Sequence, residues 1–317
     1  MGAQIAPKSP ASTLRLLLAQ RDGPPILLGG AHDALSAKLT QEAGFDGIWA
    51  SGFGISAVQA VPDANILSMT ETIDAMAGMA AAVPGVPVLA DVDGGFGNAI
   101  NVMRTVQSCE RAGLAGVCIE DNIFPKRCSF YDLVQRALVP IDEHVGKIRA
   151  AVAARRDPDF VVVARTEALI VGAGIEEALR RARAYRNAGA DALLVHSKQP
   201  NFGELREFAD RWFAGLYEQP DNQTQQCPLI AVPTTYGMTS AEELADAGFR
   251  IIIFANQALR AAVRAMRQVL TDLKREARPS AVEDHIATLP EIYKLVGVPD
   301  LVANEAEFLP TPETSIN

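Results

Sequence analysis

The stretch NAGADALLVH (187–196) carries the pattern that determines the fold: the end of a helix, a glycine, an acidic residue and a short apolar run. Three other segments share the helix end, the glycine and the apolar run, with Asp46, Ala115 and Arg250 at the position of Asp191: EAGFDGIWA (42–50), RAGLAGVCI (111–119) and DAGFRIIIF (246–254). Glycine adopts a left-handed backbone at a helix end at little cost, and the apolar run is typical of a buried strand. Repeated helix–glycine–strand segments indicate βα units, which assemble into parallel sheets.

Eight apolar runs predict eight strands, at Pro25–Gly29, Gly47–Ala50, Pro87–Ala90, Gly116–Ile119, Phe160–Ala164, Ala192–Val195, Pro228–Val232 and Ile251–Phe254. Helical patterns between them are clearest at Ala34–Ala43, Ile175–Ala188 and Ala258–Ala277. Eight βα units in about 250 residues predict an α/β fold, a (β/α)8 TIM-type barrel. A doubly wound sheet is the alternative. No G-x-G-x-x-G follows the first strand, however, and no G-x-x-x-x-G-K-[ST] occurs.

The C-terminal segment differs from the βα repeats. We expect residues 1–277 to form the catalytic barrel domain and residues 278–317 a C-terminal helical tail. Arg278-Pro279-Ser280 breaks the last barrel helix, and Val282–Val296 has apolar residues at helical spacing. An amphipathic helix outside a complete barrel usually packs on a neighbouring subunit. The tail therefore predicts oligomerisation.

Composition limits the kind of partner. The formal charge of −9 argues against a nucleic-acid or anionic membrane surface. No apolar stretch reaches the roughly 20 residues needed to span a bilayer, and Met1–Pro10 lacks the pattern of a signal peptide. The four cysteines, Cys109, Cys118, Cys128 and Cys227, form no C-x-x-C pair, which favours free thiols. We expect a cytoplasmic protein without nucleic-acid or membrane partners.

Four predicted strands end in charged or imidazole side chains. These ends are Asp91-Val92-Asp93, Glu120-Asp121, Arg165-Thr166-Glu167 and His196-Ser197-Lys198. The carboxyl ends of barrel strands are where enzymes of this architecture keep their active sites. The pattern therefore predicts an enzyme.

The acidic strand ends suggest a metal site. Asp91 and Asp93 are two residues apart, so we expect both side chains on one face of the strand. With Glu120 from the next strand, these carboxylates repel one another unless a cation lies among them. Ligands that are all oxygen suit Mg²⁺. The alternative is that the acids cap helices or face solvent.

Arg165 and His196 are the basic counterparts. Arg165 suits bidentate capture of a carboxylate or phosphate, although an ion pair with one of the neighbouring acids is an alternative. His196 is the one histidine of four at a strand end, while His144 and His285 lie in helical segments that we expect to be exposed.

The segment FPKRCS (124–129) follows an acidic strand end and could fold over the pocket as a lid. Cys128 next to Lys126 and Arg127 predicts a lowered thiol pKa, and the alternative is an ordinary loop cysteine. The polar segment Gly215–Gln226 indicates a solvated loop without chemistry.

Six motifs together carry a resemblance to a known family. They are SGF (51–53), PDAN (62–65), DVDGGFGN (91–98), EDNIFPK (120–126), ARTEA (164–168) and HSK (196–198). Across Ile26 to Pro310 the chain resembles the phosphoenolpyruvate mutase/isocitrate lyase superfamily. HSK and FPK are similar to the branch that acts on the phosphorus–carbon bond: phosphoenolpyruvate mutase and phosphonopyruvate hydrolase.

The resemblance implies a Mg²⁺-dependent phosphomutase that interconverts phosphoenolpyruvate and phosphonopyruvate, a small anionic substrate, through an enolate. It implies metal ligation by Asp91, Asp93 and Glu120. The catalytic residues it implies are Asp63, Lys126, Cys128, Arg165 and His196. It assigns substrate binding to Ser51, Gly52, Phe53, Asn122 and Ser129, with the backbone N–H groups of Ser51–Phe53 on the substrate carboxylate. A homotetramer or homodimer is implied as well.

Departures from the family pattern keep other outcomes open. Mutases usually have Lys where Asn122 stands and Asn where Cys128 stands. At the position of Cys128 the hydrolase has Thr, and lyases have a catalytic cysteine. Phosphonopyruvate hydrolase, a carbon–carbon lyase on a 2-hydroxy or 2-oxo dicarboxylate using Cys128, and a non-catalytic scaffold are the alternatives.

Overall fold

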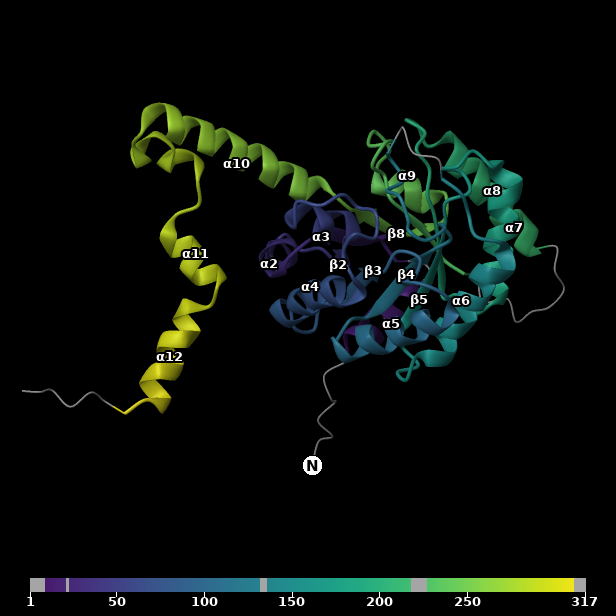
Figure 1. Cartoon of the computed structure of the whole chain (residues 1–317), viewed down its shortest axis with the longest axis horizontal. Helices are drawn as coiled ribbons and strands as arrows, with labels where there is room; N and C mark the ends of the chain where they lie inside the picture. The colour runs from purple at the N-terminus through teal and green to yellow at the C-terminus, as the bar shows by residue number, and fades with distance from the viewer. Residues whose placement is uncertain (1–8, 21–22, 132–135, 218–226, 311–317) are drawn as a thin grey trace, which may run out of the picture. The chain divides into compact units, whose positions relative to one another are not determined.

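The structure is a computed structural model that describes residues 9–20, 23–131, 136–217 and 227–310. The eight predicted strands form one closed parallel barrel in sequence order (Figure 1), so the predicted fold class is confirmed. The strands are β1 Ile26–Ala31, β2 Gly47–Ala50, β3 Val88–Asp91, β4 Gly116–Glu120, β5 Val161–Thr166, β6 Ala192–Val195, β7 Leu229–Ala231 and β8 Phe249–Phe254. Pairing of β1 with β8 closes the barrel, which rules out the open doubly wound sheet.

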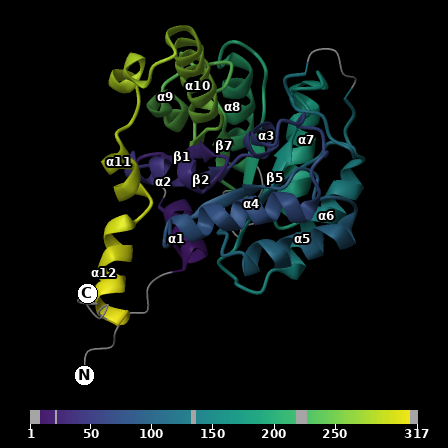
Figure 2. The same cartoon turned by 60° about the vertical axis from the view of Figure 1, so that its left-hand side comes forward.

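Helices surround the strands (Figures 1 and 2). They are α1 Pro10–Ala19, α2 Ala34–Glu42, α3 Gly52–Val58, α4 Met69–Ala82, α5 Ala99–Arg111, α6 Ile141–Ala154, α7 Gly174–Asn187, α8 Gly203–Tyr217 and α9 Ala241–Asp246. Helix α10, Gln257–Glu276, follows β8. Several begin at side chains that satisfy the free N–H groups of the first turn. Ser68 and Ser240 each form a capping box with a glutamate three residues on.

Two apolar cores follow from the two-residue period of a strand. One set of strand residues, including Leu28, Trp49 and Val163, fills the barrel interior. The alternate residues pack outward against the helices in a larger cluster. Leu14 of α1 belongs to the interior cluster, and Arg15 forms an ion pair with Asp191, just before β6, at 2.6 Å. Helix α1 therefore covers the end of the barrel where the strands begin.

The chain divides into two compact units, Met1–Leu259 and Arg260–Asn317. The second unit contains most of α10, two short 3-10 turns at Pro279–Ala281 and Glu283–His285, α11 Leu289–Leu295 and α12 Val298–Phe308. The predicted single helix at Val282–Val296 is wrong in its first half, because Thr288 and Glu291 cap a separate helix that begins there. A barrel domain ending at residue 277 stays a prediction.

In the part of the chain that the structure describes, no helix combines the length and apolar character needed to cross a membrane. Of the predicted loop Gly215–Gln226, the first three residues end α8, and residues 218–226 lie outside the described ranges.

Candidate active site

A cavity of about 260 Å³ opens at the carboxyl ends of the strands. It is lined by Trp49, Ser51, Phe53, Asp63, Asp91, Glu120, Lys126, Arg127, Cys128, Ser129, Phe130, Tyr131, Arg165, His196, Val232, Thr234, Ala255 and Asn256. The structure brings together all the residues predicted from the sequence, and all of them except Gly52, Asp93 and Asn122 line the cavity.

Strand geometry explains why four charged or imidazole side chains meet here. Asp91, Glu120, Arg165 and His196 each come two residues after a residue of the interior cluster: Leu89, Cys118, Val163 and Leu194. Side chains two apart on a strand point the same way, so each continues the interior-facing row at the end of its strand. The predicted charged and imidazole side chains therefore gather because each lies in the interior-facing row of its own strand.

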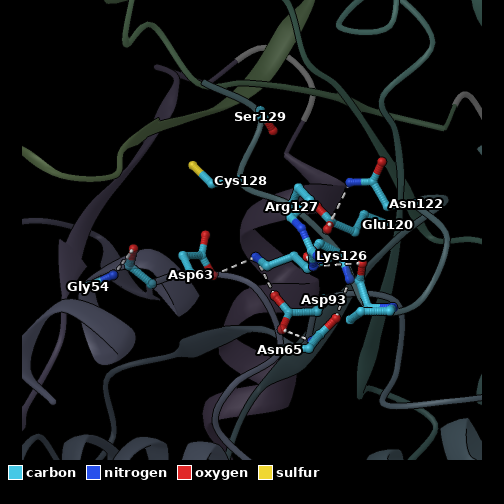
Figure 3. Close-up of polar contacts among 12 residues, drawn as sticks. Gly54, Asp63, Asn65, Asp93, Glu120, Asn122, Lys126, Arg127, Cys128 and Ser129 are labelled. Atoms are coloured by element: carbon cyan, nitrogen blue, oxygen red, sulfur yellow. Dashed lines mark hydrogen bonds and ion pairs between the residues drawn. The ribbon is translucent and has the colours of Figure 1, made fainter. Parts of the chain in front are cut away.

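Lys126 lies at the centre of the acidic side of the cavity. Its Nζ is 2.9 Å from Asp63 Oδ1 and 2.5 Å from Asp93 Oδ1, and Figure 3 shows the side chain reaching between the two carboxylates. Asn65 donates from Nδ2 to Asp93 Oδ2 at 2.6 Å and accepts the backbone N–H of Lys126 at 2.6 Å. The 61–68 loop therefore fixes both the lysine and the aspartate.

Asp91 and Asp93 present their carboxylates to the same point. A Cβ on Gly52 would lie 3.3 Å from Asp91 Oδ2 and 3.4 Å from Asp93 Oδ1. Asp93 reaches this position with a left-handed backbone, φ 52°, rather than by continuing the strand. The predicted shared facing of the two acids therefore holds, but a turn at Asp93 produces it.

Burial is the main electrostatic effect on these acids. It raises the pKa of Asp93 to about 8 against the opposing effect of Lys126, and it raises the pKa of Asp91 against Lys126 and Arg165. Burial lowers the pKa of Lys126, but Asp93 and Asp63 outweigh it, so that pKa is raised and the ammonium persists. Burial therefore disfavours the charged form of Asp91 and Asp93, and the Lys126 ammonium opposes that effect.

The donor set fits a hard divalent cation. Within the described ranges, no three acidic, histidine or cysteine side chains converge tightly enough to surround one ion, and the Lys126 ammonium lies among the acids. The neighbouring groups are nevertheless carboxylate oxygens, and the absence of a side chain on Gly52 leaves space beside Asp91 and Asp93. Oxygen donors of this kind are those that Mg²⁺ takes.

Arg165 is held in one orientation by several partners. Its Nε donates to Glu167 Oε1 at 2.7 Å, and its Nη2 donates to Ser129 Oγ at 2.8 Å and lies 3.3 Å from Glu120 Oε2. Ser129 in turn donates to Glu167 Oε2 at 2.6 Å. The ion pair that the sequence offered as an alternative is therefore present, and it aims the guanidinium along the cavity wall.

His196 is buried in the same wall beside Arg165. Its ring packs edge-to-face on Phe130, with centroids 5.3 Å apart, and no described residue partners its Nδ1. Burial and then the charge of Arg165 lower the pKa of His196 well below its usual value. A neutral imidazole with a free nitrogen is available for a ligand at this point.

The predicted lid segment lines the cavity and attaches to Asp63. The Cys128 N–H donates to Asp63 O at 3.2 Å, and the Tyr131 hydroxyl accepts from the Asp63 N–H at 3.0 Å. Arg136 donates to Cys128 O at 2.6 Å. These bonds hold residues 126–131 over the cavity.

The expected low pKa of Cys128 is wrong. Burial raises the pKa of this thiol to about 11. Lys126, which suggested an electropositive setting, is engaged by Asp63 and Asp93 instead. Cys128 is therefore a protonated thiol near neutral pH.

The segment Ser51–Phe53 opens α3. Ser51 Oγ accepts the Gly54 N–H at 3.1 Å, but the Ser51 N–H donates to Ala31 O at 3.0 Å inside the barrel. The expectation that all three N–H groups of this segment meet a substrate carboxylate therefore fails for Ser51. Gly52 and Phe53 are in the first helical turn, where N–H groups have no intrahelical acceptor.

Asn122 and His144 differ from their predicted settings. Asn122 donates to Glu120 Oε1 at 3.1 Å, so it supports a cavity residue from behind. His144, expected to be exposed, is fully buried with its ring centroid 4.4 Å from that of Tyr185. The helical pattern around His144 did not identify which face of α6 packs on the barrel.

Tyr131, Thr234 and Asn256 line the cavity but were missed in the sequence. Thr234 and Asn256 come shortly after the ends of β7 and β8. Position after a strand is the signal that could have found them, since Ser51 and Asn122, also uncharged and polar, follow β2 and β4.

The fold and cavity define a β/α-barrel protein whose polar site lies at the carboxyl ends of the strands. A family model described as phosphoenolpyruvate phosphomutase matches residues 15–274. A phosphonopyruvate hydrolase of Variovorax sp. (strain Pal2) is 44% identical over 280 residues, 88% of this chain and 92% of the relative. A phosphoenolpyruvate phosphomutase of Streptomyces hygroscopicus is 42% identical over 286 residues, 90% and 88% respectively.

A solved phosphonopyruvate hydrolase in complex with oxalate and Mg²⁺ superposes with a TM-score of 0.86. It is 41% identical, with 96% of this chain and 100% of the other covered. The chain belongs to the phosphoenolpyruvate mutase family, within the isocitrate lyase superfamily.

Proposed function

We propose that this protein is a Mg²⁺-dependent phosphoenolpyruvate phosphomutase that interconverts phosphonopyruvate and phosphoenolpyruvate. The observation that carries the proposal is the division of one lidded cavity into two halves. Buried carboxylates of Asp63, Asp91 and Glu120 form one side, and Arg165 with a neutral His196 forms the other. A small substrate with a carboxylate, an oxo group and a phosphoryl group matches such a site.

We infer that Asp91, Asp93 and Glu120 would hold the metal. When bound, Mg²⁺ supplies Lewis-acid stabilisation of negative charge on the 2-oxo oxygen. The Lys126 ammonium lies between Asp63 and Asp93, which keeps a positive charge at this edge of the site. Asn122 keeps Glu120 in place from behind.

The remaining residues bind the substrate and exclude water. N–H groups of Gly52 and Phe53 would take the carboxylate, and Arg165 and His196 would take the phosphoryl oxygens. Cleavage of the phosphorus–carbon bond leaves an enolate, whose oxygen recaptures the phosphoryl group without any proton transfer. Residues 126–131 lie over the cavity as a lid and so protect the transferring group from water.

Hydrolysis of phosphonopyruvate is the second candidate, because Cys128 replaces the polar residue expected in the lid. A thiol is a poor hydrogen-bond partner both for a phosphoryl group and for a water. A carbon–carbon lyase is the third. A thiol whose pKa is raised to about 11 suits a proton donor in such a reaction.

The test is ³¹P NMR of the purified protein with Mg²⁺ and phosphonopyruvate. A new phosphoenolpyruvate signal supports the mutase, whereas phosphate with pyruvate supports the hydrolase. An unchanged phosphonate signal would overturn both, and Cys128 would then be tested as a lyase acid. Joint stabilisation by Mg²⁺ and oxalate in a thermal-shift titration separates any enzyme from a scaffold, which would show none.

Two variants probe the lid. Cys128→Asn should raise the ratio of isomerisation to hydrolysis, because an amide can hold the phosphoryl group. Cys128→Thr should lower that ratio, because a hydroxyl can position water. If both variants keep the parent ratio, the side chain at position 128 does not set the outcome.

We also propose that the protein is a cytoplasmic homotetramer or homodimer joined through residues 278–317. Support comes from apolar side chains left exposed on α11 and α12, including Leu289, Tyr293, Leu301 and Phe308. The free cysteines fit a reducing compartment. Light scattering after size exclusion, on a chain ending before Val282, should give a smaller oligomer, and an unchanged mass would exclude the tail.

A further inference from the structure

One wall of the cavity has no part in the proposed reaction. In a closed barrel of eight strands in sequence order, β7 lies opposite β3 and β8 lies opposite β4. Thr234 and Asn256, which follow β7 and β8, therefore face Asp91 and Glu120 across the mouth. Val232 and Ala255, also on this wall, are apolar.

Thr234 and Asn256 form a pair with unused hydrogen-bonding capacity. Asn256 Nδ2 donates to Thr234 Oγ1 at 3.4 Å, which leaves the hydroxyl proton of Thr234 free to donate. Asn256 Oδ1 is buried, and no described residue donates to it. An orphaned carbonyl oxygen at a buried position carries a desolvation cost unless a ligand or a water satisfies it.

The pair presents one donor and one acceptor to the cavity. A water or hydroxyl group can accept from Thr234 and donate to Asn256 at the same time, which meets the two partners that a buried water needs. A carboxylate or ionised phosphoryl oxygen offers only acceptors and would face Asn256 Oδ1 unfavourably. The chemistry therefore selects water or a hydroxyl over the anionic ends of the substrate.

We propose that Thr234 and Asn256 bind one water molecule inside the closed cavity, and that this water sets how much phosphonopyruvate is hydrolysed. The inference rests on the proposed phosphorus–carbon chemistry. In hydrolysis the phosphorus–carbon bond breaks and its electron pair stays on the carbon fragment as the enolate. The water oxygen forms the new bond to phosphorus, and the enolate methylene carbon takes up a proton to give pyruvate. Isomerisation needs no water, so a retained water affects one outcome only.

The neighbouring strand places this water on the phosphoryl side. β7 pairs with β6, which carries His196 at its end. The wall thus lies beside the residues that hold the phosphoryl group and across from the acids. A lid alone would not remove a water bound inside the cavity. The protein therefore has a second determinant of hydrolysis besides Cys128.

The experiment measures the ratio of phosphate to phosphoenolpyruvate by ³¹P NMR for the parent, Thr234→Val and Asn256→Leu. Each substitution should lower the hydrolytic share by about tenfold, the effect of losing one hydrogen bond to the water. Thr235→Val is the matched control: its hydroxyl is also buried and has no partner among the described residues, but it lies off the cavity wall, so the parent ratio should persist.

An unchanged ratio in both variants overturns the proposal. If KM for phosphonopyruvate also rises, the pair binds the substrate's own oxygens instead of a water.

A crystal structure of the full chain with Mg²⁺ and oxalate provides a readout that does not depend on turnover. A water within hydrogen-bond distance of Asn256 Oδ1, lost in Asn256→Leu, supports the subsite even if phosphonopyruvate proves not to be the substrate. Absence of that water in the parent overturns it. Failure of the proposed function appears instead as an untouched phosphonate signal in the parent.

Discussion

Glu120 and Asp121 are adjacent buried acids at the end of β4, yet their surroundings are opposite. Glu120 points into the barrel, where it lies near Asp91 and accepts from Asn122 with Arg165 3.3 Å away. Asp121 points outward to α7. Its Oδ2 accepts from Tyr185 at 2.7 Å, Thr166 at 2.9 Å and Arg181 at 3.1 Å, and its Oδ1 accepts from the Glu167 N–H at 2.9 Å.

This difference in surroundings means that the Asp121 carboxylate stabilises the fold, whereas the Glu120 carboxylate is available for binding. Burial raises the pKa of Asp121, but four donors, two on α7 and two at the end of β5, compensate the buried charge within the chain. On the cavity side the carboxylates of Asp63, Asp91, Asp93 and Glu120 have Lys126 among them, and Arg165 is shared with Glu167. A buried acid with all its partners built in holds the fold, whereas a group of acids short of cations binds one.

The largest expected effect is on stability, at Asp121. Asp121→Ala should lower the free energy of unfolding by about 3–5 kcal/mol, because it removes the buried acid of Arg181, whose remaining acidic partner is Glu177. Tyr185→Phe removes the donor to Asp121 and the acceptor for Arg181 but keeps the ion pair, so it should cost less, about 1.5–3 kcal/mol, the range for a hydrogen bond to a charged group. Urea unfolding measures both. Equal and small losses would mean that Asp121 is not the centre of this network.

The opposite result is expected at Asp91, which faces the cavity. Asp91→Asn should reduce kcat/KM by about 10²–10³-fold, comparable to loss of a main electrostatic group in an active site. Its unfolding free energy should not fall, because neutralising one of several crowded acids relieves repulsion. Urea unfolding and NMR assays on the same preparation check the two halves. A marked loss of stability would contradict the contrast with Asp121.

How far the sequence could predict this contrast depends on the range of the interactions. Apolar runs and the glycines before them are local, so the barrel and the strand ends carrying Asp91, Glu120 and Arg165 could be predicted. The sequence could not distinguish Glu120 from Asp121, because that depends on strand register and on Arg181 and Tyr185 of α7. Arg181 and Tyr185 lie 60 and 64 positions further along the chain than Asp121.

Burial of polar groups was the other unpredictable quantity. Neighbours in sequence suggested a reactive Cys128 and an exposed His144, but packing from distant segments buries both groups and shifts their pKa values. The same applies to Thr234 and Asn256, whose importance comes from the cavity they face rather than from their residue types. Local patterns therefore identified the acids and bases, and tertiary packing determined their states.

A smaller effect on stability is expected from His144, a buried histidine whose protonation is unfavourable in the folded protein. Burial and then Lys147 lower the pKa of His144 to about 3. The unfolded chain takes up this proton near pH 6.5 and the folded chain does not, so stability present above that pH is lost as pH falls. Between pH 7 and 5 the loss should be about 2 kcal/mol, and His144→Leu should remove that part of the pH dependence in urea unfolding. An identical pH profile in the variant would show that His144 does not contribute.

The smallest effect on stability is expected at Arg180. It lies next to Arg181 on α7, and both arginines pair with Glu177. Arg180 donates to Glu177 from an exposed position, whereas Arg181 reaches Asp121 inside the protein. Arg180→Ala should leave the urea midpoint unchanged within error, because solvent and salt screen exposed pairs. Arg181→Ala should shift that midpoint strongly, because it strands the Asp121 charge. Arg180 and Arg181 thus repeat the comparison of Glu120 with Asp121. If Arg180→Ala and Arg181→Ala shift the urea midpoint equally, burial does not decide which charges matter for stability here.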